Sequence, residues 1–417
     1  MYKESEFNNI ITINGKKHIY NSMTKAYIKI HDDLSIREIV NKINNKEKNH
    51  LFFELIKYGF IIEKDFDEIS LLEYGYNKTY FNTSNLNVVL VPTLKCNFSC
   101  PYCFEKGYNI EENKKYFEIL KKFSIINFKS CSNIQISLFG GEPLLKEKDL
   151  FDYLEFLSKL KEKYIFSLSS SIVTNGSLIT EDTVKTLIKY SCRSIQITID
   201  GDQKRHDELR KFVNDKPSYY LLLSKIEMIL NLTKNTQNFT FILRINLKDI
   251  EEDEIMESLS NIDKKYRSRI SILFRPIYNT KKYIFENKNS FEELKKFLDL
   301  GVELGYNVVK NRSFYKSCES CGDDNFYYIM PDLKLWKCIG DLSYEKACIG
   351  KIDDEGELNI NSQNMIDWFN ASNCFKEREC RECKLLPDCY GGCILYKIKS
   401  NERSCKTFDM AALPYLY

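Results

Sequence analysis

Three cysteines lie close together in the segment VPTLKCNFSCPYCFE. Cys96, Cys100 and Cys103 follow the spacing C-x3-C-x2-C. Three thiolates on one loop can bind three irons of a [4Fe–4S] cube and leave the fourth iron open, as a catalytic cluster requires. The alternative is a zinc site that borrows a fourth ligand. Cytosolic zinc sites usually pair two C-x2-C units, however, and no second pair lies nearby.

Most of the fifteen cysteines lie in a second, loop-rich region after about residue 310. Its tail reads CRECKLLPDCYGGC and gives Cys380-x2-Cys383-x5-Cys389-x3-Cys393, with Cys405 twelve positions further on. Upstream lie Cys318, Cys321 and Cys338. Such a region needs covalent or metal staples, and metal clusters are the intracellular option, with structural zinc as the alternative.

Short polar motifs follow three of the predicted strands. They are Gly140-Gly141-Glu142-Pro143, then Thr174-Asn175-Gly176, then Asp200-Gly201 with His206-Asp207 and Arg210 downstream. Glycines permit close backbone approach, and a carboxylate accepts hydrogen bonds from an ammonium group. Each motif can also be an ordinary turn, and Arg210 can equally be a surface ion-pair partner.

Together these motifs resemble those of radical S-adenosylmethionine (SAM) enzymes. The resemblance implies that Cys96, Cys100 and Cys103 hold a SAM-binding cluster. It places the SAM amino group at Gly140, Gly141 and Glu142, the ribose at Thr174 and Asn175, and the carboxylate at Thr198 and Arg210. The implied activity is reductive cleavage of SAM to a 5′-deoxyadenosyl radical, which abstracts hydrogen from an unactivated C–H bond.

The cysteine-rich tail resembles the SPASM domain of radical SAM enzymes that modify peptides. The resemblance implies two auxiliary [4Fe–4S] clusters, and therefore three clusters in all. One would be held by Cys380, Cys383, Cys389 and Cys405. The other would be held by Cys321, Cys338 and Cys393, with Cys318 as its possible fourth ligand, although the short spacing between Cys318 and Cys321 departs from the family pattern. Cys348 or Cys374 could also serve.

The elements that must position these residues alternate along the middle of the chain. Six apolar segments predict strands: Asn87–Val91, Ile134–Phe139, Ser167–Val173, Ser194–Ile199, Phe239–Ile245 and Ile270–Phe274. Helical patterns follow them at Glu111–Ile125, Lys146–Lys163, Thr180–Lys189, Tyr219–Lys234, Glu251–Asp263 and Phe291–Leu304. Strands alternating with helices predict an α/β fold with a parallel sheet, here a partial (β/α)6 barrel, since a closed eight-unit barrel needs more units.

The first 86 residues predict a separate small module. Its pattern is a strand at Lys17–Ile30, helices at Ser35–Asn44 and Lys48–Tyr58, and a return strand at Phe60–Glu63. This order is winged-helix-like and resembles the peptide-recognition module of many peptide maturases, although a bare structural cap is the alternative. We therefore predict a recognition module at 1–86, a radical SAM barrel at 87–309 and a SPASM domain at 310–417.

Composition limits the partners and the location. Sixty-one Lys and Arg balance 59 Asp and Glu, so the net charge of +2 gives no argument for nucleic acid or an anionic membrane. The chain has no long apolar run and no apolar signal segment at its N-terminus, which predicts a cytoplasmic protein.

The resemblance spans nearly the whole chain and implies modification of a ribosomally made precursor peptide that carries a leader segment. The bond we predict is a thioether from a Cys sulfur to carbon, with a flavodoxin- or ferredoxin-type electron donor. Carbon–carbon crosslinking and epimerisation stay open. Anaerobic sulfatase maturases are one rival, although they carry Asp directly after the cysteine that corresponds to Cys338, where this chain has Ile339 and a displaced Asp341. A peptide-binding zinc or iron–sulfur protein without activity is the other.

Overall fold

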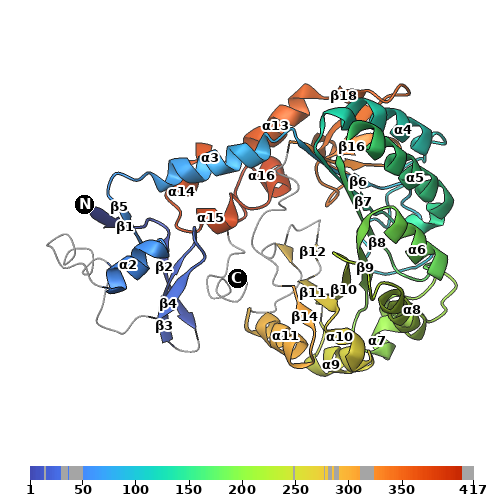
Figure 1. Ribbon diagram of the computed structural model, residues 1–417, viewed down its shortest axis with the longest axis horizontal. Helices are drawn as coiled ribbons and strands as arrows, with labels where there is room; N and C mark the ends of the chain where they lie inside the picture. The colour runs from blue at the N-terminus through green and yellow to red at the C-terminus, as the bar shows by residue number, and fades with distance from the viewer. Residues whose placement is uncertain are drawn as a thin grey trace. The chain divides into compact units, whose positions relative to one another are not determined.

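The protein is described from a computed structural model (Figure 1). It describes residues 1–13, 16–29, 36, 50–247, 249–276, 278–279, 284–285, 291–309 and 324–405. The chain divides into two compact units. One comprises the described residues of Met1–Phe81 and Phe369–Tyr417, and the other those of Asn82–Val309 and Asp324–Trp368. We call them the end unit and the sheet unit.

The sheet unit is built on six parallel strands that lie side by side in chain order. They are β6 (Asn85–Leu90), β7 (Asn133–Leu138), β8 (Ser167–Val173), β9 (Cys192–Thr198), β10 (Thr240–Leu247) and β11 (Ile270–Pro276). Each overlaps a predicted strand, so the predicted α/β class with a central parallel sheet is confirmed. The order follows because a strand, a right-handed crossover and the next strand pack back onto the same sheet.

Helices connect these strands and lie along the outer side of the sheet (Figure 1). They are α4 (Tyr116–Asn127), α5 (Glu147–Tyr164), α6 (Glu181–Lys189), α7 (Gln203–Leu209), α8 (Tyr219–Leu232), α9 (Glu252–Ser260), α10 (Lys264–Arg267) and α11 (Phe291–Glu303). The core between the layers is aliphatic and aromatic. Ile136, Leu157, Ile195 and Leu243 are fully buried in it. Along β7 and β8, buried residues alternate with partly or fully exposed ones, as in strands with one covered face.

Five further strands extend the sheet beyond the six: β14 (Asn307–Val308) beside β11, then β15 (Phe326–Ile329), β16 (Lys334–Trp336), β17 (Cys348–Ile352) and β18 (Leu358–Ile360) on the side of β6. β15 pairs parallel to β6, and β16 to β18 follow as an antiparallel meander. Sequence patterns predicted none of these five strands, because each run is only two to five residues long and shows no clear alternation.

The end unit combines both ends of the chain. Its N-terminal elements are β1 (Tyr2–Glu4), β2 (Asn8–Ile13), β3 (Lys16–Asn21), β4 (Tyr27–Lys29), α2 (His50–Lys57), β5 (Ile61–Glu63) and α3 (Glu68–Tyr80). Its C-terminal helices are the last residues of α13 (Ser362–Ser372), then α14 (Arg378–Arg381), α15 (Leu386–Cys389) and α16 (Ile394–Ser400). One apolar cluster joins the two parts and includes Phe7, Leu72, Phe375 and Leu386.

The N-terminal residues differ from the predicted pattern at several points. The predicted strand Lys17–Ile30 is two strands, β3 and β4, because a turn at Ser22–Lys25 reverses the chain. The helix at Lys48–Tyr58 and the strand at Phe60–Glu63 correspond to α2 and β5, whereas α3 was not predicted. The helix at Ser35–Asn44 lies outside the described residues except for Ile36. The division into domains at 86 and 309 stays a prediction.

No helix in the described part of the chain combines the length and the apolar character that a bilayer crossing demands.

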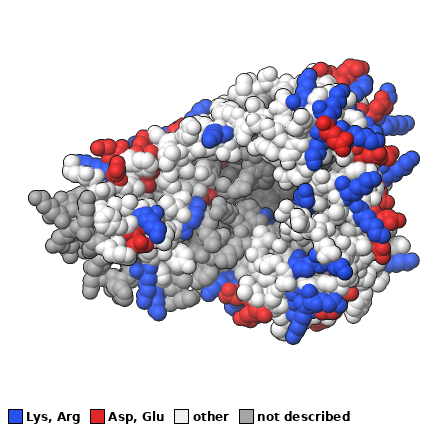
Figure 2. All heavy atoms as spheres, viewed as in Figure 1, with Lys and Arg blue, Asp and Glu red and all other residues white. Residues whose placement is uncertain are grey.

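On the face shown in Figure 2, lysines and arginines are intermixed with acidic residues. Charges interspersed in this way create no extended field of one sign.

Candidate functional site

The segment with Cys96, Cys100 and Cys103, which we call the Cys96 loop (residues 92–105), leaves the carboxyl end of β6. The next strand end holds it. The backbone N–H of Gly141 donates to the Thr93 carbonyl (3.1 Å) and that of Glu142 to the Lys95 carbonyl (2.9 Å). A Cβ at Gly141 would overlap the Lys95 carbonyl. The glycine here therefore lets the chain approach the Cys96 loop.

Glu142 joins the ends of β7 and β8 and is fully buried. Its carboxylate accepts from the Thr174 hydroxyl (2.8 Å), the Asn175 backbone N–H (2.7 Å) and the Leu144 backbone N–H (3.0 Å). Burial raises the pKa of Glu142, and these donors oppose the rise. Glu142 thus fixes the turn at Thr174–Asn175.

Asn175 continues this chain of contacts to the Cys96 loop. Its side-chain amide donates to the Asn97 side-chain oxygen (2.7 Å) and to the Cys96 sulfur (3.7 Å). Its own side-chain oxygen accepts from the backbone N–H and the hydroxyl of Ser177 (2.9 and 2.7 Å). Three strand ends are therefore linked, through hydrogen bonds, to the first cysteine.

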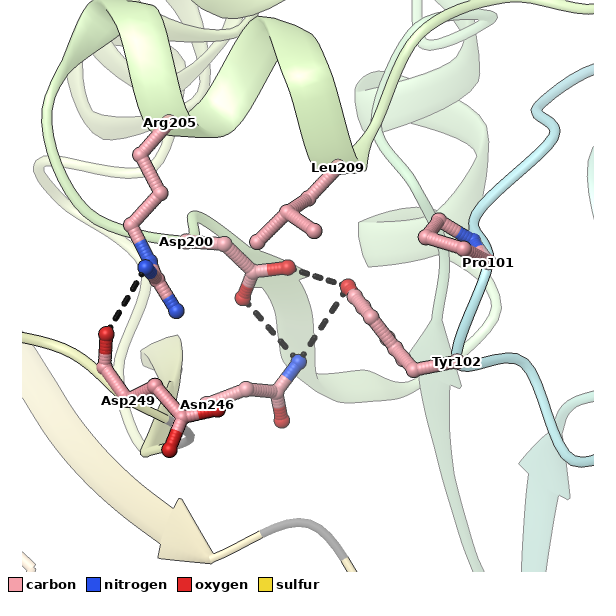
Figure 3. Close-up of a pocket in the computed structure, with 7 residues that line it drawn as sticks. All are labelled: Pro101, Tyr102, Asp200, Arg205, Leu209, Asn246 and Asp249. Atoms are coloured by element: carbon pink, nitrogen blue, oxygen red, sulfur yellow. Dashed lines mark hydrogen bonds between the residues drawn. The ribbon is translucent and has the colours of Figure 1, made fainter.

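Tyr102 clamps the other side of the Cys96 loop (Figure 3). Its hydroxyl donates to Asp200, which follows β9, and accepts from the Arg210 guanidinium (2.8 Å). The Asn246 side-chain amide, from β10, donates to Asp200 (3.0 Å) and lies 3.4 Å from the Tyr102 oxygen. Arg210 also lies over the Phe98 ring, 5.8 Å from its centroid. Tyr102, which lies between Cys100 and Cys103, therefore fixes the Cys96 loop through the hydrogen bonds of its hydroxyl.

A cavity of about 270 Å³ opens beside this clamp. Pro101 and Tyr102 line it from the Cys96 loop, and Asp200, Arg205, Leu209, Asn246 and Asp249 line it from the ends of β9 and β10 and from α7 (Figure 3). Acidic, amide and guanidinium groups in one small pocket suit a polar ligand.

The three thiols of the Cys96 loop are partly buried. Burial raises the pKa of Cys96 to about 11 and also raises the pKa of Cys100 and of Cys103. The Arg210 guanidinium opposes the rise at Cys100. Thiols of this kind ionise when a bound metal stabilises the thiolates.

The remaining motif residues on this side support the backbone. His206 is buried, accepts from the Asp200 backbone N–H (3.2 Å) and lies 3.0 Å from the Ser218 hydroxyl. Asp207 accepts from the backbone N–H groups of Ser218 and Tyr219 (2.8 and 2.9 Å), which begin α8. His206 and Asp207 therefore hold the turn between α7 and α8.

The structure brings most of the predicted SAM-contact residues to one edge of the sheet. Gly140, Gly141 and Glu142 follow β7, Thr174 and Asn175 follow β8, and Thr198 ends β9. Sequence reasoning missed Asn97, Asn246 and Glu105. Glu105 is buried two residues after Cys103, and burial raises its pKa to about 8. Asn246 could have been predicted, because it is a polar residue that directly follows the predicted strand Phe239–Ile245.

The second cysteine group forms a site in the end unit. Cys380, Cys383, Cys389 and Cys405 line one cavity of about 480 Å³, which we call the Cys380 cavity. Burial raises the pKa of Cys380 to about 11 and that of Cys389 to about 12. Arg403 lines the same cavity and pairs through two nitrogens with Glu377 (2.7 and 3.0 Å).

The other C-terminal cysteines have separate places. Cys374 is fully buried in the apolar cluster with Phe7, Leu72 and Leu386. Cys393 precedes α16, and its sulfur accepts from the Tyr396 backbone N–H (3.5 Å). In the sheet unit, Cys338 follows β16 and Cys348 begins β17. Cys318 and Cys321 lie outside the described residues.

In the part of the chain that the structure describes, no three His, Cys, Asp or Glu side chains converge tightly enough for one metal ion. Four thiolates around one zinc ion lie about 3.8 Å apart, as tetrahedral Zn–S bonds require. A cubane spreads its thiolates over different irons, so a wider arrangement of cysteines does not conflict with a cluster.

Comparison with known proteins identifies the family. Residues 90–256 match the model of the Radical SAM superfamily. The chain is a radical SAM enzyme. It is 26% identical over 389 residues to the radical SAM cyclopropyl synthase TigE of Paramaledivibacter caminithermalis, covering 84% of this chain and 78% of that protein. It is 25% identical over 340 residues to the cysteine-type anaerobic sulfatase-maturating enzyme of Clostridium novyi, covering 74% and 88% respectively.

Solved structures share the fold. The enzyme is similar to anSMEcpe with bound AdoMet and Kp18Cys peptide, with a TM-score of 0.55, 20% identity, and coverage of 80% of this chain and 98% of that one. It is also similar to Streptococcus suis SuiB bound to precursor peptide SuiA, with a TM-score of 0.52, 18% identity, and coverage of 96% and 98%. The identified family implies a [4Fe–4S] cluster and SAM as cofactors.

Proposed function

We propose that this radical SAM enzyme modifies a ribosomally synthesised precursor peptide and forms a thioether bond from a Cys sulfur to carbon. The observation that carries the proposal is the end unit. There Phe7, in the turn before β2, and Leu72, in α3, share one apolar cluster with Leu386, which lines the Cys380 cavity. A module able to capture a peptide is thereby built together with a site able to hold a cluster.

The SAM-binding cluster fits the Cys96 loop. Its three thiols lie on one loop, and the Asn175 side-chain amide donates to the sulfur of Cys96. Hydrogen bonds to the cysteine sulfurs are common around iron–sulfur clusters and tune their reduction potentials. The backbone N–H groups of Gly141 and Glu142 hold the loop against the end of β7, and the Glu142 carboxylate fixes the turn after β8. When bound, the cluster and SAM supply a 5′-deoxyadenosyl radical.

The residues at the strand ends would bind and orient SAM. We assign the amino group to Gly140, Gly141 and Glu142 and the ribose to Thr174 and Asn175, with the carboxylate near Thr198 and Arg210. Arg210 is more than nine-tenths buried, and its Nε lacks a hydrogen-bond partner within the described structure. A buried guanidinium with an unmet donor favours a carboxylate ligand over a role at the surface.

The Cys380 cavity fits an auxiliary [4Fe–4S] cluster, because four thiols line one space and Arg403 brings a positive charge beside them. We assign the second auxiliary cluster to Cys338 and Cys393 with Cys321 and Cys318. An iron without a full set of protein ligands could bind the thiolate of the substrate and so direct the radical product toward a thioether.

The N-terminal module would capture the leader segment as an added strand. In the described residues β4 pairs with β3 alone, which leaves an edge whose N–H and C=O groups can pair with a peptide. SuiB, which shares the fold, was solved with a precursor peptide. A flavodoxin- or ferredoxin-type protein would supply the electron.

Two measurements test this function. Anaerobic enzyme with SAM and dithionite should release 5′-deoxyadenosine, and Cys96→Ala should abolish the release while Cys192→Ala, a buried residue in β9, retains it. Incubation with the peptide encoded beside the enzyme should give a product that has lost two hydrogen atoms and one alkylatable thiol. An unchanged thiol count would remove the thioether assignment.

Iron analysis tests the auxiliary assignment. Cys389→Ala should lower the iron content per chain, whereas Cys374→Ala should retain it, because Cys374 packs in the apolar cluster and does not line the cavity. Stoichiometric zinc with no iron after anaerobic reconstitution would instead support structural zinc.

Sulfatase maturation is the second candidate, and one contact favours it. Asp341 is buried in the sheet unit, and its carboxylate accepts from the hydroxyl of Tyr108 (3.3 Å), which follows the Cys96 loop. A carboxylate held there could serve as a base. Conversion of a sulfatase-derived Cys peptide to an aldehyde, lost in Asp341→Asn, would support this candidate over thioether formation.

A further inference from the structure

The turn after β3 holds the residue that precedes Cys389. The Tyr20 hydroxyl, near the end of β3, donates to the two carboxylate oxygens of Asp388 (3.1 and 3.3 Å). The Lys25 ammonium forms an ion pair with the same carboxylate and donates to the Pro387 carbonyl (3.2 Å). Two N-terminal side chains thus meet at one carboxylate beside a cysteine of the Cys380 cavity.

The same part of the N-terminal module holds the residue that follows Cys383. The Ser22 hydroxyl and the Asn9 side-chain amide (3.4 Å) both donate to the Lys384 carbonyl. In return, the Lys384 ammonium donates to the Asn8 carbonyl (3.1 Å). Both ends of the spacer between Cys383 and Cys389 are therefore fixed by residues far away in the sequence.

The Asp388 carboxylate and its partners are largely removed from solvent. Asp388 is 3% exposed and Tyr20 is fully buried, while the Lys25 side chain is 19% exposed. A carboxylate in such a place needs paired charge and hydrogen bonds. Apolar side chains of similar volume often stabilise a protein equally well, so stability alone does not account for this buried ion pair.

The backbone at Lys25 points to the same conclusion. Its φ is +66°, in the left-handed region where glycine is the favoured residue. A lysine at this position costs backbone energy, and in return its ammonium reaches Asp388. The contact of the Lys25 side chain with Asp388, and not the conformation of the turn, therefore accounts for a lysine at this position.

We propose that Asp388, held by Lys25 and Tyr20, is a positioning residue for the auxiliary cluster of the Cys380 cavity. Through it the N-terminal module sets both the spacing of Cys383 and Cys389 and the reduction potential of that cluster. The inference rests on the proposed binding of a [4Fe–4S] cluster by Cys380, Cys383, Cys389 and Cys405.

The charges of the pair predict opposite effects for its two members. A reduced cluster carries one more negative charge than an oxidised one, so a nearby cation favours reduction and a nearby anion opposes it. Asp388→Asn leaves the Lys25 cation unopposed and should raise the potential. Lys25→Met leaves the carboxylate unopposed and should lower it.

The test uses the full chain with Cys96, Cys100, Cys103 and Cys338 replaced by alanine, so that iron in the Cys380 cavity dominates. After anaerobic reconstitution, iron is counted per chain and the midpoint potential is followed by electron paramagnetic resonance. Asp388→Asn and Lys25→Met should shift the potential in opposite directions. Lys25→Arg, which keeps the charge, should restore the parent value.

Two further variants separate positioning from general stability. Lys3→Met removes an exposed ion pair with Glu6 in the same unit and should leave the potential unchanged. Tyr20→Phe removes one donor to Asp388 without changing charge and should lower the potential less than Lys25→Met does, which keeps the test available if an ion-pair variant fails to fold.

The outcomes distinguish the two claims. Equal potentials in the parent, Asp388→Asn, Lys25→Met and Tyr20→Phe chains would overturn the positioning role while leaving the proposed cluster in place. Absence of iron from the four-alanine parent would instead refute the cluster in the Cys380 cavity and with it this inference.

Discussion

The two cysteine sites are supported by different physics. The Cys96 loop is held by polar contacts at the carboxyl ends of parallel strands, through Glu142, Asn175 and the Tyr102 clamp. The Cys380 cavity lies in a region of short helices, and an apolar cluster that includes Phe7 and Leu72 supports it. A regular sheet already places loops at one edge, so a few hydrogen bonds suffice there. A loop-rich segment has no regular sheet to position it, so it is held by contacts with residues distant in the sequence.

The largest expected difference between the two sites is in the reaction product that each cysteine site is needed for. Cys100→Ala should abolish formation of 5′-deoxyadenosine, because the SAM-binding cluster would lose one of its three ligands. Cys389→Ala should still form 5′-deoxyadenosine but should lose peptide modification. Chromatographic assays of both products on the two variants make the comparison. Equal loss of 5′-deoxyadenosine in both would show that the two sites are not separable.

Removal of apolar support should weaken the end unit. Leu386 is 1% exposed in the apolar cluster and lines the Cys380 cavity. Leu386→Ala should lower the free energy of unfolding by about 2–5 kcal/mol through lost burial and a residual cavity. Urea unfolding of the metal-free chain measures it, and Leu71→Ala, at a position 45% exposed in α3, is the control. Equal effects at the two positions would contradict the packing argument.

Removal of polar support should weaken the sheet unit. The two carboxylate oxygens of Glu142 together accept three hydrogen bonds, and Glu142→Gln would replace one of these oxygens by an NH2 group that cannot accept. This should cost about 2–3 kcal/mol. Thermal unfolding of the metal-free chain checks this. Glu155→Gln, at an exposed pair with Lys159, should leave the transition unchanged. A neutral Glu142→Gln would mean that the strand ends are fixed without this carboxylate.

The smallest expected effect depends on pH and belongs to the sheet unit. Burial holds the pKa of His206 well below its ordinary value of 6.5, and the Arg210 charge adds to this. As the pH falls through 6.5, the unfolded chain takes up a proton that the folded chain refuses, so stability decreases. The slope should approach about 1.4 kcal/mol per pH unit.

Urea titrations between pH 7.5 and 5 measure that slope. His206→Gln should flatten it, whereas His50→Gln, at an exposed position in α2, should retain it. A slope that survives in His206→Gln would assign the pH dependence to other groups.

Local patterns predicted the six central strands and most of their helices, because alternation of apolar runs with long amphipathic segments is a property of neighbouring residues. They did not predict β15–β18 or α3. Those strands are short, and β15 is stabilised by pairing with β6, more than two hundred residues earlier in the chain. Pairing between segments so far apart produces no periodic pattern in the local sequence.

The sequence by itself determined the chemistry that this protein can do: which cysteines lie on one loop, and which polar residues follow the strands. Only the tertiary structure decided how those residues are used. Gly141 and Glu142 bind the protein's own backbone because β7 and β8 are neighbours in the sheet. Asp388 meets Lys25 and Tyr20 because the two chain ends pack together. Contacts between residues hundreds of positions apart depend on the packing of the whole chain and not on local spacing.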